Sequence, residues 1–328
     1  GAGCTLVPVA NSFWATRAMF FATGFGFALM KVSVYSVIGL FTSSASGHAR
    51  LLAMIEAAFM TAVVASAWIF AWFIDPSDPS SPGWLHVYWL LVAMCVVAAM
   101  AIGAVRIDEG ALADSADTDT PATAFREMLS LLALRATQIF IVGVFLYVFI
   151  EQGLGTWLPT INHKALGLDG KIAVQAASAF AMSIAAGRFV AGLIVARLGW
   201  LKLLLGCLSG MALILMVVPI LAAGAGTHVV ASWTEVPFAA YLLPLIGFFM
   251  APIYPTLNSV VLSTVPKGRQ AGLIGLIVVF SALGGTTGSR MVAVLFSSER
   301  SAQVLYSLLA PIAVLAGATL WLSRLSRA

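Results

Sequence analysis

The chain is 328 residues long, 61% of its residues are apolar, 9% are charged, and its formal net charge is +4. A soluble domain of this composition would expose more apolar surface than water tolerates, so an ordinary soluble protein is excluded and lipid is indicated as the solvent. The basic charge then reflects orientation in the membrane, which argues against nucleic acid as a partner.

The apolar residues fall into runs that are long enough to cross a bilayer as helices. Residues 1–9 are too few to span, and Pro8 is expected to close this run. Because the first residue is Gly1 and not Met, the chain is expected to begin inside a helix truncated at its N-terminus. Nine complete runs of about 20 or more residues follow: 14–41, 50–74, 84–105, 136–158, 171–197, 201–223, 236–263, 270–296 and 302–323. Since every backbone amide in lipid needs an internal partner, the predicted fold is all-α and polytopic.

Basic residues divide unequally between the two sides of the membrane. If residues 42–49 form a cytoplasmic loop, ten Lys and Arg residues lie on that side: Arg50, Arg106, Arg126, Arg135, Arg197, Lys202, Lys267, Arg269, Arg324 and Arg327. Four lie on the other side: Arg17, Lys164, Lys171 and Arg300. This bias predicts the orientation, in an inner or plasma membrane of bacterial type.

The stretch 106–135 is the only long charged segment of the chain, with Asp and Thr residues gathered around Pro121. It predicts a cytoplasmic linker between two helical bundles. The N-terminal bundle, residues 1–105, is expected to be incomplete, with its first helices missing. The C-terminal bundle, residues 136–328, contains six predicted spans.

Five ionisable side chains fall within the predicted spans: Lys31, Glu56, Glu151, Arg188 and Arg290. Each costs several kcal/mol there unless it meets a partner or a water-filled cavity, so these positions point to function. Lys31 is the deepest cation. It is a candidate for substrate binding or proton coupling, together with Tyr35 in the same stretch, or for a structural ion pair with Glu56.

Glu151 lies in YVFIEQGLGTWLPT with Tyr147 one turn before it. With Gln152 and Trp157 these side chains form a polar and aromatic set suited to a hydroxylated ligand, in a span that can break at its glycines. The alternative is an interhelical hydrogen bond that stabilises packing.

A second group of candidates concerns gating. Arg188 and Arg197 in GRFVAGLIVARLGW and Arg290 after the glycine cluster are interpreted as structural or latching cations. Pro252 and Pro255 predict a bend, around which Tyr254 and Asn258 add hydrogen-bonding groups to the cavity. The GxxxG pair Gly284 and Gly288 predicts close helix packing.

These stretches, together with GFGFALMKVSVYS at 24–36 and GFFMAPIYPTLNSVVLS at 247–263, resemble the major facilitator superfamily, and most closely its fucose, galactose and glucose permease branch. The resemblance implies two pseudo-symmetric bundles around a midplane cavity, alternating access and, often, proton symport. One position departs from the pattern, because sugar symporters of this branch often carry an acid where this chain has Leu29 and then Lys31. Glu151 is therefore the leading remaining candidate for the proton carrier.

The predicted function is secondary active transport of a small polar solute, a sugar or a related organic compound, coupled to protons. Lys31 also suits an organic anion, and the many Phe and Met residues suit multidrug-type efflux. A non-transporting membrane sensor is a more remote alternative, because it would need an output domain.

No catalytic, cofactor or metal motif occurs in the sequence. The four His residues fall in loops or at span ends, which argues against an enzyme. Cys4, Cys95 and Cys207 are widely spaced within apolar runs and are interpreted as small buried side chains. No cofactor is expected, and the expected partners are the solute, protons and the lipid bilayer around a monomer.

Overall fold

The computed structural model describes residues 1–41, 45–78, 81–104, 121–223, 230, 232–262, 270–297 and 303–325. Some side chains within these ranges lie outside the description, among them those of Lys31, Tyr35 and Glu56. The chain forms two compact units, Gly1–Thr118 and Asp119–Ala328, whose boundary falls within the segment 106–135.

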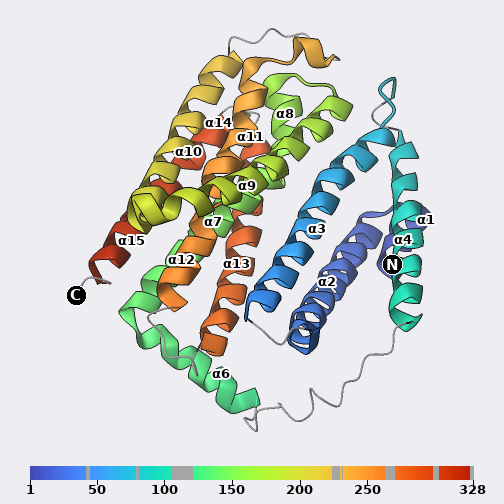
Figure 1. Ribbon diagram of the computed structural model, residues 1–328. Coiled ribbons are helices and arrows are strands. Elements are labelled where there is room, and N and C mark those ends of the chain that lie inside the picture. Colours follow the sequence, from blue (N-terminus) through green and yellow to red (C-terminus); the bar gives the residue numbers. More distant parts are fainter. Residues whose placement is uncertain are drawn as a thin grey trace. The chain divides into compact units, whose positions relative to one another are not determined.

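The elements described in the first unit are all helices (Figure 1). Its elements are α1 (Ala2–Ala10), α2 (Phe13–Phe41), α3 (Ala45–Trp72), the 3-10 helix η1 (Pro82–His86) and α4 (Val87–Ala104). Helix α1 packs against α2 and α4, and α2 packs against α3. A small core at the junction of these elements buries Val7, Met19 and Leu85.

Helix α1 continues through Pro8 to Ala10, so the prediction that Pro8 closes the first run is wrong. Proline removes one backbone hydrogen bond but tolerates a helical φ, and the buried Cys4 and Val7 on the same helix hold the turn in place. The helix ends at Ala10. The next residue, Asn11, adopts a left-handed conformation with a φ of 39°, and its N–H donates to the carbonyl of Val7.

The second unit contains the remaining elements (Figure 1): α6 (Pro121–Ser130), η2 (Leu131–Ala133), α7 (Arg135–Gly155), α8 (Leu158–Leu166), α9 (Gly170–Leu198), α10 (Trp200–Ala223), η3 (Trp233–Glu235), α11 (Phe238–Met250), α12 (Ile253–Leu262), α13 (Gln270–Ser297), α14 (Gln303–Ser307) and α15 (Leu309–Leu325). Helix α7 contacts α12, α13 and α15, whereas α11 contacts α9 and α10. The two groups are joined mainly through α10, which also contacts α12, α14 and α15.

The all-α polytopic prediction is confirmed. Seven helices within the described residues are long and apolar enough to cross a bilayer: Pro82–Ala104, Arg135–Gly155, Gly170–Val195, Trp200–Ala223, Phe238–Asn258, Gly272–Ser297 and Val304–Arg324. Helices α2 and α3, with 29 and 28 residues, occupy the first two predicted spans. Large apolar side chains stand exposed along these helices, for example Phe21, Met100 and Phe189, as expected of surfaces that face lipid.

The end of the predicted linker is structured and belongs to the second unit. Helix α6 packs against α13, where the backbone and side chain of Met128 lie close to Gly272 and Gly275. Glycines at these positions let the two helices approach closely. The linker therefore ends as a helix attached to the second bundle.

A short helix, α8, follows α7 directly and was not predicted. It begins after a two-residue turn at Thr156 and Trp157, and it ends at Gly167, which has a φ of 68°. The buried Asn162 donates from Nδ2 to the carbonyl of Ala173 at 3.2 Å, which joins α8 to α9. The helix could not be predicted from the sequence, because a segment of nine residues with mixed polarity is too short to resemble a membrane span.

Candidate functional site

The candidate site in the second unit begins with two side chains on α7. Tyr147 and Glu151 lie one helical turn apart on the same face, and the Tyr147 hydroxyl donates to Oε1 of Glu151 at 3.2 Å. Tyr147 is buried, whereas Glu151 is partly exposed. The hydrogen bond satisfies one carboxylate oxygen and leaves the other available to a ligand.

Helix α12 brings Tyr254 against this pair. The rings of Tyr147 and Tyr254 lie 5.4 Å apart between centroids with an interplanar angle of 31°. The span that carries Tyr254 is broken between α11 and α12 by a turn at Ala251 and Pro252. Pro252 lacks the N–H that would continue the helix, and this break turns α12 so that its first turn contacts α7.

Asn258 lies one turn beyond Tyr254 on α12. Its Oδ1 is buried and has no hydrogen-bond partner within the part of the chain that the structure describes. Buried polar atoms are normally paired, so this oxygen is an acceptor available to a donor from water or solute. Pro255, between the two residues, is exposed.

Arg188 on α9 supplies a positive charge to the site. Its exposed guanidinium lies within electrostatic range of both Glu151 and Tyr147. The preceding residue, Gly187, faces the carbonyl of Phe248 so closely that a Cβ atom would not fit. The absence of a side chain there lets α9 approach α11, and this approach positions Arg188.

A second contact lies at the end of α7. Trp157 donates from Nε1 to Oγ of Ser289 on α13 at 3.0 Å, and its ring stacks on Phe296 at 5.8 Å. Gln152 is exposed and accepts a hydrogen bond from Thr156 at 3.3 Å. Sequence analysis missed Ser289 and Phe296, although Ser289 directly follows the predicted GxxxG pair and so shares the α7–α13 contact.

The remaining predicted site residues are not brought into this group. Arg197 is exposed in the last turn of α9, and Arg290 is exposed on α13. Lys31 and Tyr35 belong to α2 and Glu56 to α3, but their side chains lie outside the described residues. The structure thus assembles Tyr147, Glu151, Tyr254 and Arg188 from three helices.

Within the described residues, no group of three or more His, Cys, Asp or Glu side chains is arranged to hold a metal ion. Cys4 and Cys207 are buried, whereas Cys95 is exposed, which differs from the prediction that all three are buried. Cys95 lies on α4 on the side that approaches Gly1, where a Cβ atom would lie 3.0 Å from the Cβ atom of Cys95.

The sequence matches the model of the Major Facilitator Superfamily over residues 1–289. The chain therefore belongs to the Major Facilitator Superfamily, and it is a multi-pass membrane protein of the secondary-transporter class.

Two solved structures share its fold. One is the crystal structure of the E. coli fucose:proton symporter FucP, with a TM-score of 0.53 and 18% identity. The other is a crystal structure of the transporter FucP in the outward conformation, with a TM-score of 0.54 and 19% identity. Each comparison covers 98% of this chain and 80% of the other. The resemblance to the fucose permease branch is thus confirmed at the level of the fold, and no curated protein matched the sequence.

Proposed function

We propose that the protein moves a small polar solute, a sugar or a related hydroxylated compound, together with protons by alternating access of two helical bundles. The observation that carries this proposal is the Tyr147–Glu151 hydrogen bond beside Tyr254. Within the spans of the second unit Glu151 is the only carboxylic acid in the sequence. The similarity in fold to the E. coli fucose:proton symporter FucP supports the same assignment.

In this proposal Glu151 carries the proton. A carboxyl group can be charged or neutral, and a change of one charge inside a span alters the energy of the site enough to tie protonation to a conformational change. The Tyr147 hydroxyl orients the carboxyl group, and Arg188 balances its negative charge.

The solute is bound by groups that suit hydroxylated compounds. Aromatic rings such as Tyr254 offer an apolar face and a polar edge, and the free Oδ1 of Asn258 accepts a hydrogen bond from a hydroxyl. Gln152 and Trp157, and in the first bundle Lys31, Tyr35 and Glu56, complete the proposed set. The bundles are residues 1–105 and 136–328, joined by the cytoplasmic linker 106–135.

A second candidate is transport of an organic anion. The observation that favours it is the exposed guanidinium of Arg188 within electrostatic range of Tyr147 and Glu151, because a cation in a membrane cavity can bind a carboxylated solute directly. Lys31 would add a second positive charge. In that case Arg188 contacts the solute instead of balancing Glu151.

The test is transport by the purified protein in liposomes that contain a pH-sensitive dye. Hexoses and then small carboxylates are added outside, with wild type, Glu151→Gln and the control Glu235→Gln compared side by side. Glu235, the last residue of η3, is an exposed acid outside the spans. Its replacement by Gln therefore removes the same charge as Glu151→Gln without changing the site. We expect hexose to acidify the lumen with wild type and Glu235→Gln, but not with Glu151→Gln.

Other outcomes assign the roles differently. A Glu151→Gln protein that kept its full pH dependence would remove Glu151 as the proton carrier. Lumen pH changes with carboxylates alone would favour the organic anion, and Arg188→Gln would then abolish uptake.

A further inference from the structure

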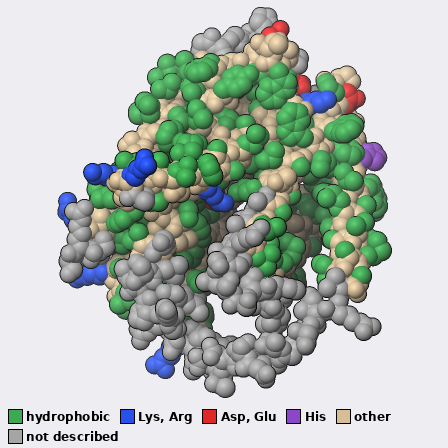
Figure 2. Space-filling model, viewed as in Figure 1, with side chains coloured by type: hydrophobic (Ala, Val, Ile, Leu, Met, Phe, Trp, Pro, Cys, Tyr) green, Lys and Arg blue, Asp and Glu red, His purple; other side chains and the backbone are tan. Residues whose placement is uncertain are grey.

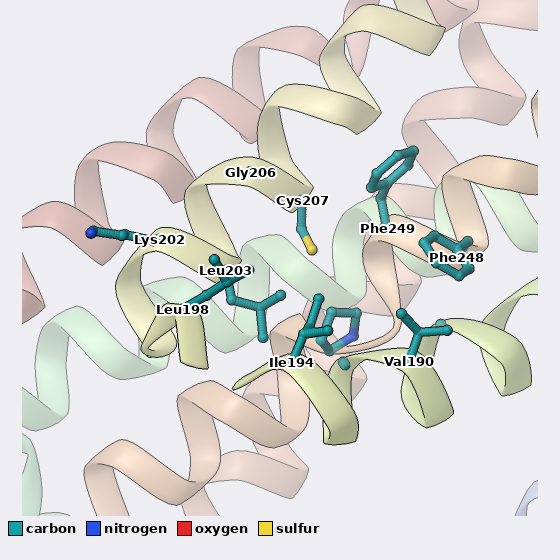
Figure 3. Close-up of a pocket in the computed structure, with 12 residues that line it drawn as sticks. Val190, Ile194, Leu198, Lys202, Leu203, Gly206, Cys207, Phe248 and Phe249 are labelled. Carbon is teal, nitrogen blue, oxygen red and sulfur yellow. The ribbon is translucent and has the colours of Figure 1, made fainter. Parts of the chain in front are cut away.

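A groove separate from the Tyr147–Glu151 pair lies between α9, α10 and α11 (Figure 3). It has a volume of about 270 Å³ and is lined almost entirely by apolar side chains, including those of Val190, Ile194, Cys207 and Phe248. Gly206 on α10 also lines it, and a Cβ atom at this position would meet nothing within 4 Å. The missing side chain of Gly206 keeps part of this space open.

A positive charge lies beside one end of the groove. Lys202, in the first turn of α10, is the only charged residue in the lining; it is exposed, and its side chain extends away from the other lining side chains (Figure 3). Arg197 is exposed in the last turn of α9, just before the short connection to α10. Both residues belong to the set that the distribution of Lys and Arg assigns to the cytoplasmic side.

The side chains around the groove are those of a lipid-facing surface. Leu198, which lines the groove at the end of α9, is 47% exposed, and Leu213, two turns beyond Gly206 on α10, is 59% exposed. Helices α9 and α10 are apolar and long enough to span a bilayer, and α11 does so together with the following residues through Asn258. Hydrophobic side chains cover the face formed by these helices in Figure 2, with Lys and Arg side chains at its edge. The groove therefore opens to hydrocarbon rather than to water.

We propose that this groove binds one anionic phospholipid of the cytoplasmic leaflet. An acyl chain fills the apolar space between α9 and α11, and the headgroup phosphate is held by Lys202 with help from Arg197. A soluble anion would gain nothing from the apolar walls, and a neutral lipid would leave the cation without a partner. Basic sites between helices on the cytoplasmic side are suited to anionic headgroups.

The groove lies next to the bend between α11 and α12, which connects it with the helix that carries Tyr254. Pro252, at the turn between α11 and α12, lines the groove, and the same turn sets the direction of the helix that carries Tyr254. An acyl chain bound in the groove would therefore contact this bend directly.

The test is native mass spectrometry of the purified protein in detergent with equal amounts of phosphatidylglycerol and phosphatidylcholine of the same acyl composition. We expect wild type to retain phosphatidylglycerol about fivefold more than phosphatidylcholine, the effect expected of one cation near an anionic headgroup. Lys202→Gln should lose this preference, and Lys202→Arg should keep it. Lys171→Gln, at the opposite end of α9, removes the same charge and should leave the preference unchanged.

A second pair of variants tests the groove itself. Gly206→Leu fills it without a clash and should lower retention of both lipids. Gly192→Leu adds the same side chain on α9, also in open space and outside the lining, and should change neither. The proposal is wrong if wild type does not prefer the anionic lipid, if Lys171→Gln loses the preference as Lys202→Gln does, or if Gly206→Leu and Gly192→Leu behave alike. None of these readouts depends on transport, so the proposed function can fail independently.

Discussion

At the scale of single residues, the second unit pairs its polar side chains inside the spans. Tyr147 satisfies Glu151, and Trp157 is satisfied by Ser289 on another helix. In hydrocarbon an unpaired polar group is costly, so these contacts stabilise the fold as well as shaping the site. The exception among the site residues is Asn258, whose buried Oδ1 lacks a partner in the described part of the chain.

The Trp157–Ser289 hydrogen bond should contribute measurably to stability. Trp157→Phe keeps an aromatic ring to pack on Phe296 but removes the donor, and Ser289→Ala removes the acceptor. We expect each variant to lower the free energy of unfolding in detergent by about 1 kcal/mol. The double variant should lose little more than either single one, because both remove the same interaction. Fully additive losses would show that the two side chains do not interact.

At the scale of elements, glycines determine how closely the helices pack. Gly284 and Gly288 on α13 face the carbonyls of Phe145 and Phe149 on α7, with no room for a Cβ atom. On the other side of the contact, a Cβ atom at Gly153 would lie 3.3 Å from the carbonyl oxygen of Gly288. The predicted GxxxG packing is thus confirmed, and its partner is the helix that carries Glu151.

Replacement of Gly288 by Ala should force α7 and α13 apart. The obstacle is backbone, which cannot rotate away, so we expect a loss of about 1–3 kcal/mol in stability, typical of overpacking. Thermal unfolding in detergent measures this loss. Gly317→Ala on α15 is the matched control, because a Cβ atom there meets nothing within 4 Å, and Ala should stabilise that helix by up to about 1 kcal/mol. Equal melting temperatures for the two variants would contradict the close packing.

At the scale of the whole molecule, the distribution of Lys and Arg predicts which ends of the helices face the cytoplasm. Ala133 in η2 lies near the end of the predicted cytoplasmic linker, residues 106–135, and Glu235 in η3 lies on the opposite side of the predicted topology. Both residues are exposed, so a cysteine placed at either position can be reached by a reagent from its own side. These two positions make the orientation testable.

The topology can be mapped with a membrane-impermeant maleimide on a background without Cys4, Cys95 and Cys207. We expect Glu235→Cys to be labelled in intact cells and Ala133→Cys only after the membrane is permeabilised, because positive residues are retained in the cytoplasm. If only Ala133→Cys were labelled in intact cells, the orientation would be the opposite of the predicted one. Lys202 would then lie at the outer leaflet.

Much of the fold could be predicted from the sequence, because each span must satisfy its own backbone in lipid. Length and hydropathy are local properties, so the positions of the long helices followed from them, and the break near Pro252 followed from the two prolines, Pro252 and Pro255. Helix α8 and the passage of α1 through Pro8 were not predictable in this way. Both depend on packing, through Asn162 against α9 and through the buried Cys4 and Val7.

The sequence by itself determined the class of protein, the helical architecture and which polar residues stand inside the spans. Only the tertiary structure decided which of them meet: Tyr147 with Glu151 and Tyr254, and Arg188 close by. Tyr147 and Glu151 share one helix, so their contact was within reach of sequence spacing. Tyr254 and Arg188 come from other helices. Contacts between helices depend on how closely and at what angle the helices cross, and glycines such as Gly187 determine this by allowing close approach.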